Sequence, residues 1–254
     1  MLADERRSQI MEMLKKRPSI TTSELTRFFQ VSLETIRRDL EYMEGQGVLR
    51  RVHGGAVAVG RQLGYSSLTK RTASHQPEKR NLALTACSYI QEGDYIALDT
   101  GSTTFELANL LGERFRELTV LTHSLEVARI LSEQPGIHTI LAGGFYLREE
   151  KCFCGHLTLD MIRQLHVAKC FIAPSAVSLS FGASDHMQEL IAVQRAFLGI
   201  SDQVYMLVDS SKFETFAPLK ICDLQPRFLC ITDSGLPDEV LEAYKKASVN
   251  IVKK

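Results

Sequence analysis

Apolar residues recur at helical spacing near the start of the chain and predict two short helices. The first, residues 6–17, has one apolar side and stops at Pro18, because proline cannot continue a helix. The second, residues 24–29, is expected to turn Leu25 and Phe28 inward. A turn of three residues separates it from a further helical pattern, which is the spacing of a helix-turn-helix motif.

The third helical pattern, residues 33–44, is followed by a basic hairpin. Ser32 is placed to cap this helix by accepting a hydrogen bond from a free backbone N–H of its first turn. The buried face consists of apolar residues three or four positions apart: Ile36, Leu40 and Met43. Residues 48–57 form two short strands bent at a Gly-Gly pair. Residues 1–57 are therefore predicted to be a winged helix-turn-helix domain.

Beyond residue 77, short apolar runs alternate with amphipathic helices. Seven runs are expected to be strands: residues 95–99, 118–122, 139–142, 169–173, 204–208, 228–232 and 249–252. Helices are expected after Pro77 and at residues 104–111, 125–133, 157–165, 187–198 and 238–247. This alternation predicts an α/β domain over residues 77–254, with a mostly parallel sheet covered on both faces. Residues 58–76 are polar, show no clear period and are interpreted as a linker.

The chain carries 30 basic and 30 acidic side chains, but the charge is unevenly divided. Residues 1–60 hold ten Lys and Arg against eight Asp and Glu, and residues 61–80 hold five against one. Attraction to phosphate depends on the field within a Debye length rather than on the total, so the wing and linker are expected to approach nucleic acid. No apolar run reaches the roughly 20 residues that span a bilayer, so no membrane association is expected. The six cysteines are interpreted as reduced thiols of a cytoplasmic protein.

The second helix of a helix-turn-helix pair lies in the major groove, with its N-terminal residues toward the bases. Thr35 and Arg37 are expected nearest the base edges, since arginine can hold guanine through two hydrogen bonds. Arg38 is expected on a phosphate; an inward ion pair with Asp39 or a neighbouring acid is the alternative. The residues expected to contact double-stranded DNA span this helix and the wing: Ser32, Glu34, Thr35, Arg37, Arg38, Arg50, Arg51 and His53.

Two stretches carry a resemblance to a known family. TIRRDL at residues 35–40 and RRVHGGAV at residues 50–57 are similar to the N-terminal pattern of the DeoR family of bacterial regulators of sugar metabolism. The resemblance implies a repressor of a sugar or sugar-alcohol operon, with a second domain resembling ribose-5-phosphate isomerase. It also implies operator DNA and a phosphorylated sugar as partners, and a homo-oligomer, dimer or tetramer. No cofactor is expected.

Small and hydroxyl side chains follow four of the predicted strands. In residues 99–104 glycine and hydroxyls open a helix, where free N–H groups and the helix dipole favour a phosphate. Thr122-His123-Ser124 and Gly143-Gly144 follow two further strands, and Lys212 follows a fourth. Taken alone, the first loop is equally typical of a plain helix cap. A tight turn is the likelier interpretation of Gly143-Gly144, and a lone lysine in this position is more often solvated surface. Because ligands bind outside the carboxyl ends of the strands in such sheets, the four loops together predict one anion site.

In the family that the chain resembles, these segments line a sugar-phosphate pocket. Carried over, the expected effector-binding residues are Asp99, Gly101, Ser102, Thr103, Thr104, Thr122, His123, Ser124, Gly143, Gly144, Asp185 and Lys212. His123 replaces the asparagine usual in the family, so its contact with the sugar is expected to differ.

Three alternative interpretations of the sequence are weighed against a regulator with a sugar-phosphate site. Cysteines and histidines near residues 152–156, with Asp185 and His186, could be assembled into a metal site, but their spacing is not that of a zinc knuckle and no metal is predicted. An isomerase carrying a DNA-binding module would need a general base. The candidate carboxylates are Asp99, Asp185, Glu189 and Asp209. None lies in a motif that requires catalysis, so no enzyme is predicted. An activator or architectural DNA binder without a small ligand is the third reading, and the hydroxyl-rich loop argues against it.

Overall fold

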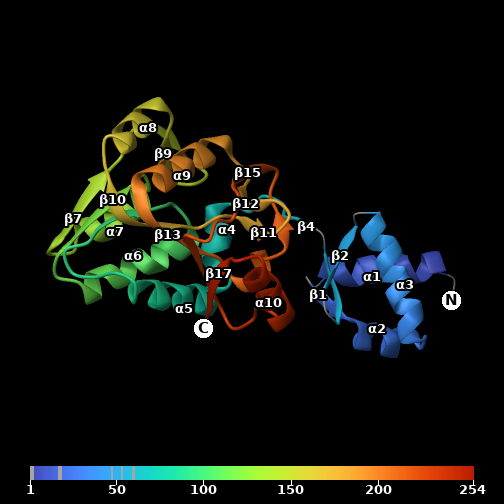
Figure 1. Ribbon diagram of the computed structural model, residues 1–254. Coiled ribbons are helices and arrows are strands. Elements are labelled where there is room, and N and C mark those ends of the chain that lie inside the picture. The colour runs from blue at the N-terminus through green and yellow to red at the C-terminus, as the bar shows by residue number, and fades with distance from the viewer. Residues whose placement is uncertain (1–2, 17–18, 47, 53, 59–60) are drawn as a thin grey trace.

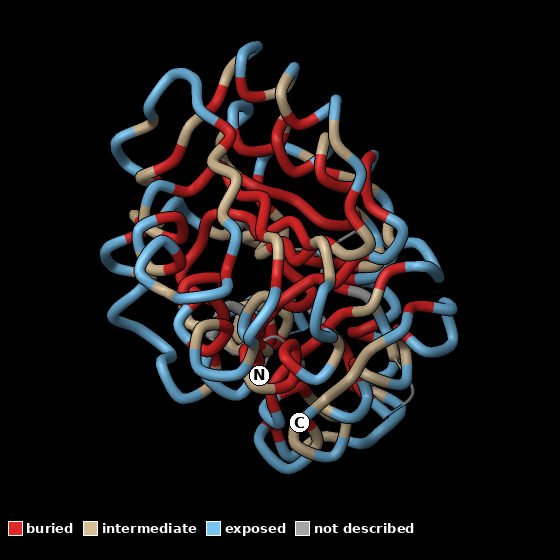
Figure 2. The backbone as a smooth tube through the Cα atoms, turned by 90° about the vertical axis from the view of Figure 1, so that its left-hand side faces the viewer, coloured by how far each residue is buried: buried red, intermediate tan, exposed pale blue. Residues whose placement is uncertain are grey.

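The computed structural model describes residues 3–16, 19–46, 48–52, 54–58 and 61–254. Figure 1 shows a small N-terminal body of helices with a short sheet, and a larger body built on a long sheet. In the larger body the buried residues gather along the central strands, as Figure 2 shows, with exposed residues on the loops around them.

The N-terminal body is a winged helix-turn-helix. Its elements are α1 (Ala3–Lys16), β1 (Ser19–Thr21), α2 (Thr22–Phe29), α3 (Leu33–Gly45), β2 (Leu49–Val52) and β3 (Gly55–Ala58). Strand β3 pairs antiparallel with both β1 and β2 and so completes a three-stranded sheet. The predicted helices and the hairpin are confirmed. Strand β1 was not predicted, because a run of three residues is too short to show a period.

One inward-facing residue of α2 was predicted wrongly. Leu25 is buried as expected, but Phe28 is 59% exposed and Phe29 takes the buried position. Positions three and four residues after Leu25 flank it on the same helix face, and packing in this body selects the second of them. Phe28 instead lies edge-on against the ring of Phe29, with the centroids 4.9 Å apart.

The larger body is a parallel sheet of seven strands, and each corresponds to a predicted strand. They are β5 (Tyr95–Leu98), β6 (Leu118–Thr122), β7 (Ile137–Leu141), β10 (Val167–Ile172), β13 (Ser201–Leu207), β16 (Phe228–Thr232) and β17 (Asn250–Lys253). The strand order is β17-β16-β13-β10-β5-β6-β7, and every neighbouring pair is parallel. The predicted α/β fold is confirmed.

Helices cover both faces of this sheet. One face packs against α5 (Gln76–Cys87), α6 (Ser102–Arg114) and α7 (Leu125–Ser132). The other packs against α8 (His156–Arg163), α9 (Gln188–Ile200) and α10 (Asp238–Lys246). Alternate residues of a strand serve the two layers: Ile96 and Leu98 belong to the first core, and Ala97 between them to the second.

Several short elements outside the large sheet were not predicted. They are β4 (Arg61–Gln62), α4 (Leu68–Ala73), β8 (Phe145–Leu147), β9 (Cys152–Cys154), β11 (Ala176–Ser178), β12 (Gly182–Asp185), the 3-10 turn η1 (Ser210–Lys212), β14 (Thr215–Phe216) and β15 (Leu219–Cys222). Two of them, β4 and α4, fall within residues 58–76, the expected linker. Strand β4 pairs with β14, and α4 buries only Leu68. This segment is therefore ordered, but it has too few buried apolar residues for its sequence to show a helical or strand period.

The strand order places a switch point between β5 and β10. From β5 the chain moves outward through β6 to β7, and from β10 it moves the opposite way through β13 and β16 to β17. The loops that leave the carboxyl ends of β5 and β10 therefore diverge and leave a crevice, which is where open α/β sheets bind ligands. Within the described residues, none of the helices has the length and apolar character needed to cross a membrane.

Candidate functional site

Helix α3 presents a polar face that the rest of the N-terminal body leaves open. Ser32 caps it by accepting a hydrogen bond from the Thr35 backbone N–H at 3.2 Å, as predicted, and the two hydroxyl groups lie 2.9 Å apart. Ile36, Leu40 and Met43 are buried on the opposite side. The polar face is formed by Ser32, Glu34, Thr35, Arg37 and Arg38, of which only Thr35 is half-buried and the others are exposed.

Asp39 has arginine partners other than Arg38. Its buried carboxylate accepts from Arg6 Nε at 2.5 Å and from Arg7 Nε at 2.9 Å, so α1 holds the base of α3. Arg38 points outward, 3.4 Å from Glu34 in an exposed pair. The alternative of an inward pair between Arg38 and Asp39 is wrong, because Asp39 is already occupied on its buried side.

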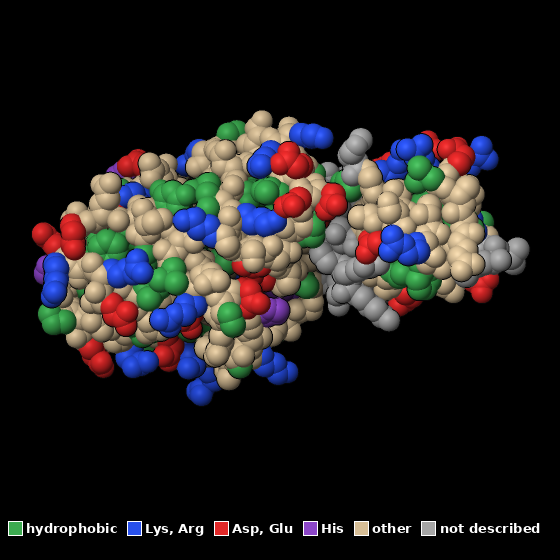
Figure 3. Space-filling view, turned by 90° about the horizontal axis from the view of Figure 1, so that it is seen from below, with side chains coloured by type: hydrophobic (Ala, Val, Ile, Leu, Met, Phe, Trp, Pro, Cys, Tyr) green, Lys and Arg blue, Asp and Glu red, His purple; other side chains and the backbone are tan. Residues whose placement is uncertain are grey.

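The wing contacts the C-terminal half of α3. The Arg51 backbone N–H donates to Glu44 Oε1 at 2.7 Å, and the Arg51 guanidinium lies 3.8 Å from Glu41. A groove between helix and wing is lined by Arg37, Arg51 and Thr22 among others. The side chain of Arg50 and the whole of His53 lie outside the described residues. On the face in Figure 3, basic and acidic side chains are interspersed over the larger body.

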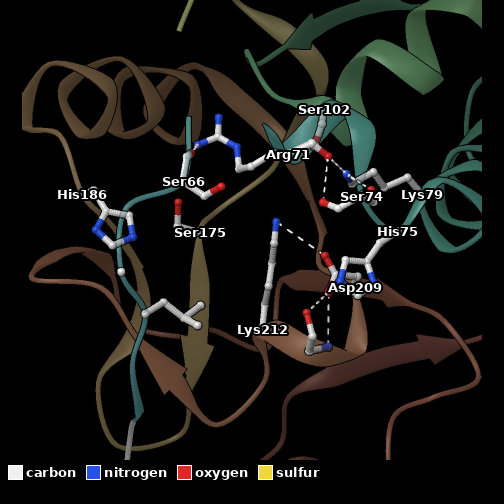
Figure 4. A pocket seen from close by; sticks show the side chains of 13 residues that line it. Ser66, Arg71, Ser74, His75, Lys79, Ser102, Ser175, His186, Asp209 and Lys212 are labelled. Atoms are coloured by element: carbon white, nitrogen blue, oxygen red, sulfur yellow. Dashed lines mark hydrogen bonds and ion pairs between the residues drawn. The ribbon is translucent and has the colours of Figure 1, made fainter. Parts of the chain in front are cut away.

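A second candidate site lies at the carboxyl ends of β5, β10 and β13, beside the switch point. It is a cavity of about 170 Å³ lined by five serines and several basic side chains, shown in Figure 4. The polar lining residues are Ser66, Arg71, Ser74, His75, Lys79, Ser102, Ser175, His186, Asp209, Ser211 and Lys212. Two of them, Ser102 and Lys212, belong to the predicted effector site.

Lys79 is the most unusual group in this cavity. Its residue is 3% exposed, and its ammonium group donates to the main-chain carbonyls of Ser74, at 2.5 Å, and Arg71. Among the described residues, no carboxylate lies within ion-pair distance of it. Burial, reinforced by the charge of Lys212, lowers the pKa of Lys79 to about 8. The charges of Asp209 and Glu106 act in the opposite direction and only partly offset this lowering. A buried cation without a direct ion-pair partner is costly, so the cavity favours an anion.

Lys212 reaches the same cavity from the loop after β13. Its Nζ lies 3.4 Å from the Pro174 carbonyl and 3.7 Å from Asp209 Oδ2, a loose pair that leaves donor capacity free. Burial alone would raise the pKa of Asp209, but the Lys212 charge and the hydrogen bonds from Ser211 outweigh it and hold that pKa below its usual value. Burial lowers the pKa of His186, on the far wall.

The N-terminus of α6 forms another wall. Gly101 is its N-cap and supplies no side-chain cap, so the first backbone N–H groups have no capping side chain. Gly101 has φ of 153°, and a Cβ there would lie 3.2 Å from Ala173 Cβ. Thr104 Oγ1 donates to the Gly101 carbonyl at 2.9 Å, whereas the buried Thr103 hydroxyl has no hydrogen-bond partner. Of the predicted residues 101–104, Ser102 alone lines the cavity, and the uncapped N–H groups at the start of α6 suit an anion next to it.

Four predicted effector residues are instead bonded inside the fold. Asp99 Oδ1 accepts from the Thr100 backbone at 2.8 Å and lies 3.0 Å from His123 Nε2. His123 Nδ1 lies 2.8 Å from the Phe153 carbonyl. Thr122 donates to the Leu98 carbonyl at 2.7 Å, and Ser124 caps α7. All four are fully buried, and none of them lines the cavity.

The remaining predicted residues lie near the cavity or away from it. Asp185 accepts from Ser175 Oγ at 2.9 Å and so positions a serine of the wall. Gly143 and Gly144 follow β7 and pack on α8, where Thr158 Oγ1 donates to the Gly143 carbonyl at 2.9 Å. A Cβ on Gly144 would lie 2.2 Å from that hydroxyl, so the close approach is to Thr158 and not to the cavity.

Arg71, His75 and Lys79 were missed as site residues. The basic surplus of residues 61–80 was visible in the sequence, but it was assigned to contact with DNA. The structure turns Arg71 and Lys79 toward the cavity instead. A charge count locates basic residues along the chain and says nothing about which side they face.

The cysteines show no sign of reactivity. All six are free thiols, and only Cys222 is not fully buried. Burial raises the pKa of Cys87 to about 11 and that of Cys230 to about 12, so both stay protonated. Over the residues that the structure describes, no cluster of three or more His, Cys, Asp and Glu side chains is arranged to hold a metal ion.

The folds of the two bodies define a class: a DNA-binding winged helix joined to an α/β sensor. Residues 6–62 match the DeoR-like helix-turn-helix domain, and residues 74–234 match the DeoR C-terminal sensor domain. The chain belongs to the DeoR family of transcriptional regulators. It is 34% identical over 251 residues to the uncharacterized HTH-type transcriptional regulator YulB of Bacillus subtilis (strain 168), covering 99% of this chain and 96% of that one.

A second relative and a solved structure are also similar to this chain. The chain is 31% identical over 244 residues to the lactose phosphotransferase system repressor of Lactococcus lactis subsp. lactis, covering 95% of each. Among solved structures, ribose 5-phosphate isomerase A of Methanocaldococcus jannaschii matches with a TM-score of 0.42 and 18% identity over 55% of each chain.

Proposed function

We propose that this regulator represses a sugar or sugar-alcohol operon and that a phosphorylated sugar in the α6 cavity controls its affinity for DNA. Helix α3 would enter the major groove with Thr35 and Arg37 toward the bases, and Arg38 and Arg51 near phosphates. The relatives support the regulatory half, since one is named as a lactose phosphotransferase system repressor.

The buried ammonium group of Lys79 carries the effector half of the proposal. It lies in a serine-rich cavity, without a carboxylate partner among the described residues and close to the N-terminus of α6. A phosphate would bring negative charge into direct contact with Lys79 and accept from backbone N–H groups, Lys79 and Lys212. The serines and His186 around it would meet the hydroxyl groups of a sugar.

DNA binding under effector control gives a direct test. DNA selected from a random pool is titrated with the purified protein, and binding is expected to weaken steeply with added salt. At least one member of a panel of phosphorylated sugars should change the affinity, while the matching unphosphorylated sugar should not. Lack of preference for any DNA over competitor at moderate salt would refute the regulatory function.

Variants separate the cavity from the DNA-binding surface. Lys212→Met and Ser102→Ala are expected to abolish or weaken the sugar-phosphate response and to leave DNA affinity without effector unchanged. Arg129→Ala, an exposed arginine of α7 with a 63% accessible side chain, is the matched surface control. A full response in both cavity variants would remove the effector from this cavity.

A further inference from the structure

The segment that joins the wing to the sheet forms one side of the anion cavity. Residues 61–75, here called the connector, supply six of the thirteen lining residues, Arg71 and His75 among them. The sheet supplies the opposite side through Ser102, Ser175 and Lys212. An anion in this cavity therefore touches two parts of the chain that are not continuous.

The connector is attached to the larger body mainly by polar contacts. Strand β4 pairs with β14, and the Leu63 backbone N–H donates to the Phe216 carbonyl at 2.9 Å. Arg71 donates from Nη1 and Nη2 to the fully buried carboxylate of Glu150, and Tyr65 donates to the same carboxylate at 3.0 Å. Burial and the Glu150 charge raise the pKa of Tyr65 to about 12, so its phenol remains a donor.

Glu150 also links the connector to the α6 loop. Its main-chain carbonyl accepts from Thr100 Oγ1 at 3.0 Å, immediately before Gly101 and Ser102. Lys79, on α5, donates to the main-chain carbonyls of Arg71 and Ser74 near the end of the connector. Apolar burial contributes little to this attachment: of the connector residues with described side chains, Leu68 is the only large apolar one that is fully buried.

We propose that an anion in the cavity clamps the connector onto the sheet, so that ligand occupancy and connector docking are one equilibrium. This inference rests on the proposed function. The charge of the anion would bridge Lys212 and the α6 N-terminus on one side to Lys79 and the connector on the other. A ligand that binds the docked form better shifts the population toward it. Because the connector continues into the wing, docking would set how far each DNA-binding domain can reach.

Hydrogen exchange with inorganic phosphate as probe tests the clamp in the full chain. At a phosphate concentration about ten times its Kd, amides of residues 63–75 should exchange about tenfold more slowly than in sodium chloride of equal ionic strength. Protection confined to residues 101–104 and 209–212 would overturn the clamp while leaving the anion site standing. No protection anywhere would overturn the anion site and the clamp with it.

Matched variants assign the effect to the connector. Lys79→Met should remove the phosphate-dependent protection, while Arg80→Met, an exposed neighbour on α5, should keep it. Glu150→Gln should speed connector exchange without phosphate and weaken phosphate binding; Tyr65→Phe is the milder version if the first variant folds poorly. Unchanged connector exchange in a folded Glu150→Gln protein counts against the clamp.

An insertion separates the clamp from the effector function. Six Gly and Ser residues inserted after Gly60 leave the cavity residues in place. They should preserve connector protection by phosphate but remove the effect of a sugar phosphate on DNA affinity. If the insertion variant keeps the full effect of the sugar phosphate on DNA affinity, the connector does not carry the signal. If the wild-type protein does not bind phosphate at all, the proposed effector site itself is refuted.

Discussion

The side-chain amide of Gln194 on α9 donates to Asp99 Oδ2 at 3.0 Å and so joins that helix to the carboxyl end of β5. The same amide lies 3.3 Å from Asp185 Oδ2, and Asp185 holds Ser175 of the cavity wall. Two carboxylates predicted to meet a ligand are thus linked to each other through one buried glutamine. Their hydrogen bonds hold the edge of the sheet in shape.

Asp99→Ala is therefore expected to act on folding. It removes the nearest acceptor of the buried donors of Thr100 and Gln194 and leaves them only longer contacts of 3.3 Å, to His123 Nε2 and to Asp185 Oδ2. The substitution should lower the free energy of unfolding by about 2 kcal/mol. Asp99→Asn keeps one acceptor oxygen and should cost less. Urea denaturation followed by circular dichroism measures both. Unchanged stability together with lost phosphate binding would make Asp99 a ligand contact after all.

Lys79 predicts a pH dependence of anion binding. Its pKa is lowered to about 8 by burial and by Lys212, so the group that attracts the anion loses its charge as the pH rises through that value. Sulfate, whose charge is constant over this range, should bind more weakly from about pH 8 upward in calorimetry. Lys79→Arg should remove this decline, because arginine stays charged. A flat profile in the wild type would exclude Lys79 from the site.

The ligand-free protein should show the opposite trend. An unfolded lysine has a pKa of about 10.4, above the folded value. Between about pH 8 and pH 10 the unfolded chain binds the extra proton, so the contribution of Lys79 to stability rises with pH. Lys79→Met should flatten this part of the stability profile, which denaturation at several pH values reports.

The buried Thr103 hydroxyl gives a test with little structural disturbance. It has no hydrogen-bond partner, so Thr103→Val should leave the unfolding midpoint unchanged or slightly raised. If the hydroxyl meets the anion, phosphate affinity should fall about tenfold, the equivalent of roughly 1.4 kcal/mol for one hydrogen bond. Unchanged affinity would remove Thr103 from the effector site.

Arg37 and Arg38 should differ in their effects on DNA binding. Arg37→Ala, at the groove between α3 and the wing, should cost about 1–3 kcal/mol on the preferred sequence and relax specificity. Arg38→Ala should weaken all sequences alike and reduce the slope against salt by about one. Competition titrations at three salt concentrations separate the two patterns. Equal losses on all DNA for both variants would contradict the orientation assigned to α3.

Gly143 and Gly144 form a natural matched pair. A Cβ on Gly144 would lie 2.2 Å from Thr158 Oγ1 and 2.7 Å from the Cys154 carbonyl, while Gly143 has open space. Gly144→Ala should therefore lower stability by about 2 kcal/mol and Gly143→Ala by less than about 0.5 kcal/mol. Thermal unfolding measures the difference. If the Gly144→Ala protein is as stable as the wild type but its response to sugar phosphate is altered, this turn belongs to the effector site.

The sequence was sufficient for the strands of the large sheet, because each is an apolar run with turn signals on either side. It was insufficient for Phe28 against Phe29, since both positions fit one helix face. Thr122, His123 and Ser124 were expected at the cavity because hydroxyl and imidazole groups serve both ligands and internal hydrogen bonds, and only geometry separates the two uses. Arg71 was missed because α4 is too short to produce a period.

The division of labour at the switch point has an evolutionary consequence. The cavity walls are formed by loops, by a helix terminus and by the connector, while the apolar residues of β5 and β10 pack against the two helical layers behind them. Ser175 or His186 can be exchanged without repacking Ile172 or Ala97. If the cavity binds the effector as proposed, a lineage built on this scaffold could change the effector by a few loop substitutions, at little cost to folding and without altering α3.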